Sequence, residues 1–289
     1  MVGDAVALAL IAAVFFGSAL VLTPFGLRHL PPVRGAAVSV STTAAAFLLA
    51  SPLLVDGSAA TLPAVLVFAS VGLLFPATVT MLTFAANRRL GPHVAGALGN
   101  LAPLFAVLFA AALLGEVPSP GQVAGILVVV AGATLLVLAS ARGGEVGVRA
   151  AFLLPLAAAA VRGLVQPAVK IGFETWPSPY AAATVGYLVS AVVVVGFAAA
   201  RGGLPSLRGD RAGVLWFAAV GLCNGAAVVT MYAALARGPV ALVAPLVATY
   251  PLATLALGAV ALRGVRIGPR IAVGVAVTVA GVALLLASR

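Results

Sequence analysis

Apolar runs of about 20 residues recur along the whole chain, and short loops between them carry most of the charged residues. A helical run of this length crosses the ~30 Å hydrocarbon core of a bilayer. The first run follows Asp4 and has no basic segment before it, so it is predicted to be a helix rather than a signal peptide. The ten predicted spans lie near 4–24, 35–54, 63–86, 94–114, 121–140, 150–170, 179–200, 212–235, 240–262 and 269–288.

The pattern repeats internally. Residues 65–73 of the third span recur, with changes, as residues 214–222 of the eighth, and later landmarks keep the same order: Gly91-Pro92 with Gly238-Pro239, Pro103 with Pro251, Gly125 with Gly274, and Gly132 with Gly281. The chain is therefore predicted to be two five-helix halves, residues 1–142 and 148–289. Because five is odd, consecutive halves have opposite orientations in the membrane. The predicted fold class is all-α integral membrane, with ten transmembrane helices as two inverted five-helix repeats.

Composition supports this fold class. Hydrophobic residues make up 63% of the chain and charged residues only 8%, whereas a soluble domain has about 25% charged residues. Cys223 is the only cysteine and there are two histidines, so we expect no intrachain disulfide, no metal site and no cofactor.

The net charge of +10 has a topological explanation. Lys170, Arg237 and Arg289 lie on the side of the two termini, and the other side has the arginines 28, 34, 88, 89, 142, 149, 201, 208, 211, 263, 266 and 270. Positive loops stay in the cytoplasm. This distribution predicts an inner or plasma membrane protein with both termini external, and it leaves no reason to expect nucleic-acid binding.

Several short motifs resemble the EamA family of the drug/metabolite transporter superfamily over essentially the whole chain. They are Phe16-Gly17-Ser18, Asn100-Leu-Ala-Pro103-Leu-Phe, Leu114-Gly115-Glu116, Gln122-x-x-Gly125, Gly132, Pro245, Tyr250-Pro251, Gly274 and Gly281. Phe16 stands where the family usually has Trp. Around Arg263-Gly264 the second half lacks the acidic residue that the first half has as Glu116.

The resemblance implies transport of small molecules, often export of amino acids or other metabolites. It also implies cytoplasmic termini, which the arginine distribution opposes. We expect the arginine distribution to decide the orientation.

Arg162 lies near the middle of the sixth span, where a charge costs at least about 2.5–3.5 kcal/mol. Gln166 and Lys170 follow one and two turns later on the same face, over about 12 Å. We expect this stripe to bind an anionic group such as a carboxylate or phosphate. Alternatively, Lys170 extends to the outer interface and Arg162 binds backbone carbonyls between helices.

Other polar residues are expected to contribute hydrogen bonds to a substrate. Asn100, Asn224 and Tyr250 lie beside Pro103, Gly225 and Pro251, which can loosen or break their helices. Tyr187 and Thr83 belong to weaker polar faces of the seventh and third spans, where such side chains also bond their own helix.

The glycines of the fifth and tenth spans are predicted to permit close helix packing, with a homodimer interface as the alternative. Glu116, at a helix end, is expected to cap a helix or contact a loop, with substrate or proton binding as the alternative. No acidic residue lies in the middle of a span. This argues against a proton-coupled antiporter that exchanges protons for cationic drugs on a buried carboxylate.

The predicted function is secondary transport, as an exporter or exchanger, of small polar metabolites that are amino-acid-like or anionic. Alternating access between two helix bundles is the expected mechanism. A flippase for a lipid or lipid-linked sugar is the first rival. A membrane enzyme or a non-transporting scaffold is the second, although no HExxH motif, no Walker motif and no histidine on a core helix supports catalysis.

Overall fold

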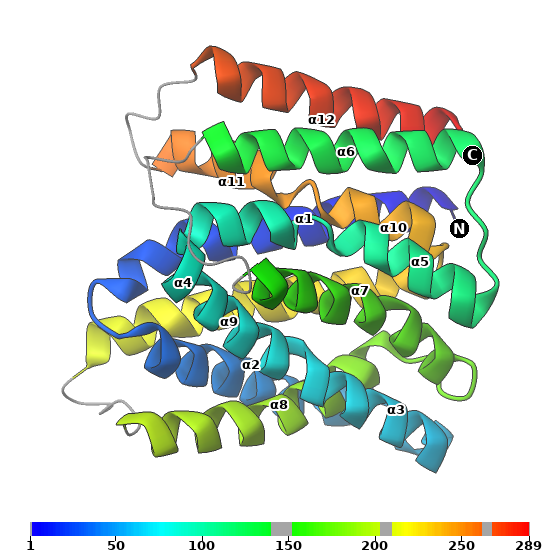
Figure 1. The fold of residues 1–289 in the computed structure, drawn as a ribbon. Helices are drawn as coiled ribbons and strands as arrows, with labels where there is room; N and C mark the ends of the chain where they lie inside the picture. Colours follow the sequence, from blue (N-terminus) through cyan, green and yellow to red (C-terminus); the bar gives the residue numbers. More distant parts are fainter. Residues whose placement is uncertain (1, 140–151, 203–209, 262–267, 289) are drawn as a thin grey trace.

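The computed structural model describes residues 2–139, 152–202, 210–261 and 268–288. They contain ten apolar helical spans of 19 to 29 residues, at the positions that the hydropathy pattern predicts. The elements are α1 (Val2–Leu27), α2 (Pro32–Leu54), η1 (Gly57–Ala59), α3 (Leu62–Gly72), η2 (Leu73–Thr78), α4 (Val79–Gly99), α5 (Ala102–Leu114), α6 (Pro120–Ala139), α7 (Leu153–Phe173), α8 (Pro179–Gly202), α9 (Arg211–Leu235), α10 (Val240–Val247), α11 (Tyr250–Ala261) and α12 (Pro269–Ala287) (Figure 1).

Proline marks where several helices begin. The first residues of α2, α6, α8 and α12 are Pro32, Pro120, Pro179 and Pro269. At this position the fixed φ of proline suits a helix and its missing N–H costs nothing, because the first-turn N–H groups have no intrahelical acceptor.

Within the described residues, three of the ten spans are interrupted. The fourth turns at Asn100–Leu101, between α4 and α5, and the ninth turns at Ala248–Thr249, between α10 and α11. Sequence predicts these two breaks from the nearby prolines. The break in the third span, at η2, is not predicted. There the backbone of Phe75 is extended (φ −141°, ψ 131°) just before Pro76.

Two other spans stay continuous although they contain residues that can distort a helix. The sixth span forms one continuous helix, α7, although it contains Pro155 and Pro167. Pro155 lies in the first turn, where no intrahelical hydrogen bond is lost. The eighth span also stays helical through Gly225.

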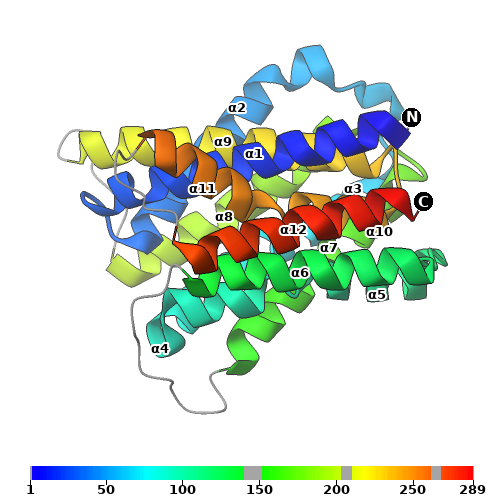
Figure 2. The same cartoon turned by 90° about the horizontal axis from the view of Figure 1, so that it is seen from above.

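The packing of the spans follows the internal repeat. α1 packs against α9 and α11, and α7 packs in the same way against α4 and α5. α2 packs on α8, and α6 packs on α12. If each span is replaced by its counterpart five places along the chain, the contacts of α1 become those of α7. The pairs α2–α8 and α6–α12 each map onto themselves. The fold is therefore two inverted five-helix repeats, and both termini lie at the same end of the bundle (Figures 1 and 2).

Glycines bring α6 and α12 into backbone contact at one edge of the bundle (Figure 1). A Cβ built on Gly125 would lie 2.7 Å from the Leu285 nitrogen, and one built on Gly281 would lie 2.5 Å from the Val129 nitrogen. The glycine faces of α6 and α12 therefore pack against each other within one chain, as the close-packing prediction requires. A homodimer stays an untested prediction.

Some sequence predictions concern residues outside the described ranges. The boundary between the halves, at residues 142–148, lies there, as do Arg142, Arg149 and Arg208. The same holds for Arg263, Arg266 and Arg289. Within the described ranges, the acidic residues lie in loops or at helix ends, as predicted: Asp4, Asp56, Glu116, Glu174 and Asp210.

Candidate functional site

The two breaks predicted from the prolines meet in the interior of the bundle. Asn100, which ends α4, is buried with 2% of its surface exposed. Tyr250 opens α11, and its hydroxyl donates a hydrogen bond to Oδ1 of Asn100 over 3.2 Å. This hydrogen bond joins the interrupted fourth span of the first repeat to the interrupted ninth span of the second.

Gly163 positions Arg162 beside this junction. A Cβ built on Gly163 would lie 2.7 Å from the Ala106 nitrogen and 2.9 Å from the Ala102 oxygen, so α7 rests directly on the backbone of α5. Nη1 of Arg162 is 4.0 Å from the position of a Cβ on Gly99, the residue before Asn100. The half-buried guanidinium therefore lies at the break in the fourth span.

The first repeat has a matching contact. A Cβ on Gly17 would lie 2.8 Å from the Cβ of Ala253 and 2.9 Å from the Thr254 nitrogen, just after the break in the ninth span. Gly17 and Gly163 therefore correspond, and Phe16 corresponds to Arg162. Sequence comparison did not find this relation, because the first and sixth spans share little beyond the glycine.

Three polar atoms of the candidate residues are buried without a hydrogen bond to any residue that the structure describes. They are Nδ2 of Asn100, Nε of Arg162 and Oε1 of Gln166. A buried unsatisfied polar group costs about 1–3 kcal/mol, and more when charged. Two are donors and one is an acceptor, so together they could bind an anionic group and a neighbouring hydrogen-bond donor.

The remaining candidates are spread over other helices. Asn224 is half-buried on α9 and corresponds to Phe75 in the register of residues 65–73 and 214–222. Tyr187 is buried on α8, edge-to-face with Phe47 at a ring-centroid distance of 5.4 Å. Thr83 is half-buried on α4. Among the residues that the structure describes, no hydrogen bond or ring contact joins these three to Arg162, and their roles stay predictions.

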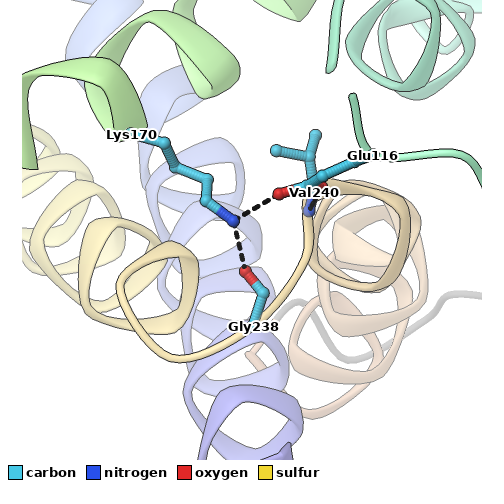
Figure 3. A network of polar contacts seen from close by, with 4 residues as sticks. All are labelled: Glu116, Lys170, Gly238 and Val240. Atoms are coloured by element: carbon cyan, nitrogen blue, oxygen red, sulfur yellow. Dashed lines mark hydrogen bonds and ion pairs between the residues drawn. The ribbon is translucent and has the colours of Figure 1, made fainter. Parts of the chain in front are cut away.

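Lys170 has a different environment (Figure 3). It lies at the end of the bundle that carries the termini, where a Cβ built on its partner Gly238 would lie 2.8 Å from the Cβ of Ala5. Its Nζ forms an ion pair with Oε1 of Glu116 at 2.5 Å and donates to the Gly238 oxygen at 3.1 Å. Oε2 of Glu116 accepts a hydrogen bond from the Val240 nitrogen at 2.6 Å. Glu116 thus makes the helix-end contact that its sequence position suggested, whereas the loop oxygen of Gly238 is bonded by Lys170.

Two hollows lie elsewhere. A vestibule of about 500 Å³ lies on the face of the bundle that carries the two termini, which we call the terminal face. It is lined by Glu116, Lys170, Leu235 and Arg237, among others. An apolar groove of about 300 Å³ runs between α3 and α7. Arg162 lines neither hollow.

Ten apolar spans in two inverted halves, with helix breaks meeting at buried polar groups, define the class of multi-pass membrane proteins built like secondary transporters. The sequence model of the EamA-like transporter family matches the chain twice, over residues 4–138 and 149–287. The chain therefore belongs to the EamA-like transporter family. Its members are transporters of small molecules rather than enzymes.

Solved structures support the same fold. One, titled "Crystal structure of protein", superimposes with a TM-score of 0.79 at 23% sequence identity and covers 99% of this chain and 98% of its own. At this identity the similarity shows the fold alone. No curated protein matches the chain.

Proposed function

We propose that this protein is a secondary transporter, acting as an exporter or exchanger, of small polar metabolites that carry an anionic group. The observation behind this proposal is Arg162, near the middle of α7, whose Nε is buried and has no hydrogen-bond partner among the described residues. A charge at this depth costs at least about 2.5–3.5 kcal/mol. A substrate carboxylate or phosphate would supply the missing countercharge.

The surroundings of Arg162 favour this assignment. The described acidic residues lie at helix ends or in loops, so none provides a fixed partner in the middle of a span. Asn100 offers a second buried donor nearby, and Gln166 an acceptor one turn along α7. An amino acid or a hydroxylated organic acid carries groups complementary to this set.

The two helix breaks support alternating access. Interrupted helices leave backbone groups free inside the membrane and let each half-helix move separately. Because the breaks in the fourth and ninth spans belong to different repeats, a rocking motion of the repeats would open the junction at Asn100 and Tyr250 first to one side and then to the other.

The test measures counterflow in proteoliposomes after a substrate has been identified by thermal shift. Amino acids, sugars, nucleosides and organic phosphates are screened, because a ligand that binds the folded state raises its midpoint. Arg162→Ala should then lower transport efficiency about tenfold or more, since a hydrogen bond to a charged group contributes about 1.5–3 kcal/mol. Arg270→Ala, at the exposed start of α12, removes the same charge as a control. Equal kinetics in both variants would refute the assignment.

The apolar groove favours one second candidate, a flippase for a lipid or lipid-linked sugar. The groove is lined by Leu66, Ser70 and Leu164, and Leu66 is 58% exposed on the outer surface of the bundle. An acyl chain could lie there while its headgroup passes through the protein. Protein-dependent movement of a fluorescent lipid between leaflets, without uptake of water-soluble substrates, would favour this candidate.

We also propose that the termini are external. Exposed arginines at the opposite end of the bundle include Arg28, Arg88, Arg211 and Arg270. In a Cys223→Ala background, a membrane-impermeant maleimide should label Ser58→Cys on intact cells but not Arg211→Cys. The reverse pattern would place the termini in the cytoplasm.

A further inference from the structure

The contacts around Glu116 form one connected polar network between three helix ends (Figure 3). Both carboxylate oxygens of Glu116 are used, one by the Lys170 ammonium and the other by the Val240 nitrogen. Lys170 also binds the Gly238 oxygen. The side chains of Lys170 and Glu116 are only 22% and 19% exposed, so solvent screens this ion pair less than a surface pair.

The network crosses from one repeat to the other. Glu116 follows the C-terminal end of α5, where Gly115 adopts a left-handed conformation (φ 67°) and the Glu116 nitrogen returns to the Ala110 oxygen. Lys170 lies in the last turn of α7, and Val240 is the first residue of α10. α5 and α10 are half-helices next to the two breaks, so the network ties down the ends of the segments that alternating access would move.

The sequence positions that align with Glu116 and Lys170 in the two repeats do not repeat their charges. In the register that aligns Pro103 with Pro251, Glu116 aligns with Gly264, and the glycine contacts align Lys170 with Pro24. Neither Gly264 nor Pro24 can form an ion pair. The sequence therefore does not repeat this ion pair at the aligned positions of the other half.

We propose that Glu116 and Lys170 form an ionic latch that closes the transport path at the terminal face and dissociates when that face opens. The inference rests on the alternating access proposed above. The latch stabilises the state closed at the terminal face. Leu235 lines the vestibule next to the latch yet is only 1% exposed, so its accessibility reports opening.

The experiment uses Leu235→Cys in a Cys223→Ala background, reconstituted in nanodiscs so that reagent reaches both faces. The rate of alkylation by a polar maleimide is measured without substrate. Glu116→Gln and Lys170→Met should each raise this rate at least about fivefold. The double variant should label no faster than the faster single variant, because the two residues act through one contact.

Matched controls come from the same vestibule. Glu174 and Arg237 are exposed residues of its lining, and Glu174→Gln and Arg237→Gln change the same kinds of charge without touching the latch. Both should label at the parent rate. Lys170→Arg keeps the charge, so its labelling rate should stay within about twofold of the parent rate. If Lys170 only filled space, the change of side-chain shape in Lys170→Arg would be expected to alter the rate as well.

The outcomes separate the latch from the transport proposal. Parent labelling rates in Glu116→Gln and Lys170→Met would overturn the latch whatever the substrate is. Arg162→Ala should label at the parent rate, so a failure of the anion proposal appears only in transport assays. If the neutral variants do not purify as monodisperse protein, Glu116→Asp carries the test. It keeps both charges but retracts the carboxylate, and an unchanged rate there would also overturn the latch.

Discussion

Replacing Gly125 by alanine tests how the fifth and tenth spans hold together. The added Cβ would lie 2.7 Å from the nitrogen and 2.8 Å from the Cα of Leu285. Carbon atoms in favourable contact are about 3.5–4.0 Å apart. Because the obstacle is backbone and cannot rotate away, α6 and α12 must separate locally by roughly 0.7–1 Å.

The energy change follows from two opposing effects. A gap of 0.5–1 Å forfeits about a quarter to a half of each dispersion contact, and overpacking of this kind costs about 1–3 kcal/mol. Alanine recovers about 0.5–1 kcal/mol through its better helix propensity. The expected loss in the free energy of unfolding is therefore about 1–2 kcal/mol. Gly196 on α8 has no atom within 4 Å of a built Cβ, so Gly196→Ala should retain the propensity gain alone.

The assay is thermal unfolding in detergent, followed by the fluorescence of Trp176 and Trp216. Gly125→Ala should lower the midpoint by about 2–8 °C, while Gly196→Ala should leave it equal or higher. Light scattering should give the same molecular mass for both variants, because the glycine face is filled within one chain. A midpoint of Gly125→Ala at or above that of Gly196→Ala would refute the packing argument, and a change of mass would support the dimer alternative.

Three other substitutions test the site and its support. Tyr250→Phe removes the donor to Asn100 and should raise the KM for substrate in counterflow by about 2–10-fold, from a hydrogen bond of about 0.5–1.5 kcal/mol; an unchanged KM would contradict the role of this junction. Thr43→Val deletes a buried hydrogen bond of 2.6 Å to the Gly221 oxygen and should cost about 0.6–1.7 kcal/mol in thermal unfolding, with transport retained. Gly163→Ala should impair both stability and transport, because its Cβ would push α7, and Arg162 with it, away from α5; normal transport at a lowered midpoint would show that the position of Arg162 is not critical.

The spans and the repeat were predictable from sequence for a simple reason. Crossing a bilayer requires a fixed length of apolar helix, so hydropathy alone sets the number and positions of the spans. Local backbone geometry was less predictable. Pro76 accompanies a break whereas Pro167 lies within a continuous helix, and the residue type alone does not distinguish the two. Neighbouring helices decide whether the freed carbonyl finds another partner.

The candidate site was predictable as a set of residues but not as an arrangement. Arg162, Gln166 and Asn100 stand out in sequence because polar groups are costly in a membrane, and the structure gives each an unpaired buried atom. Their relation to Tyr250 depends on how the two repeats pack. The partner of Lys170 was equally hidden, since Glu116 lies 54 positions away in the chain.

The differences between the halves carry more functional information than their similarity. If the two repeats were identical, exchanging them would convert the state open to one face into the state open to the other, and the two states would have equal free energies. Only positions where the repeats differ can separate those energies. Two of these differences concern the junction and the latch: Arg162 aligns with Phe16, and Glu116 and Lys170 align in sequence with Gly264 and Pro24. In the proposals made above, the first difference places the binding charge on one repeat, and the second holds one face closed. A directional transporter could therefore arise from a symmetric scaffold through these few substitutions, without any change in how its helices pack.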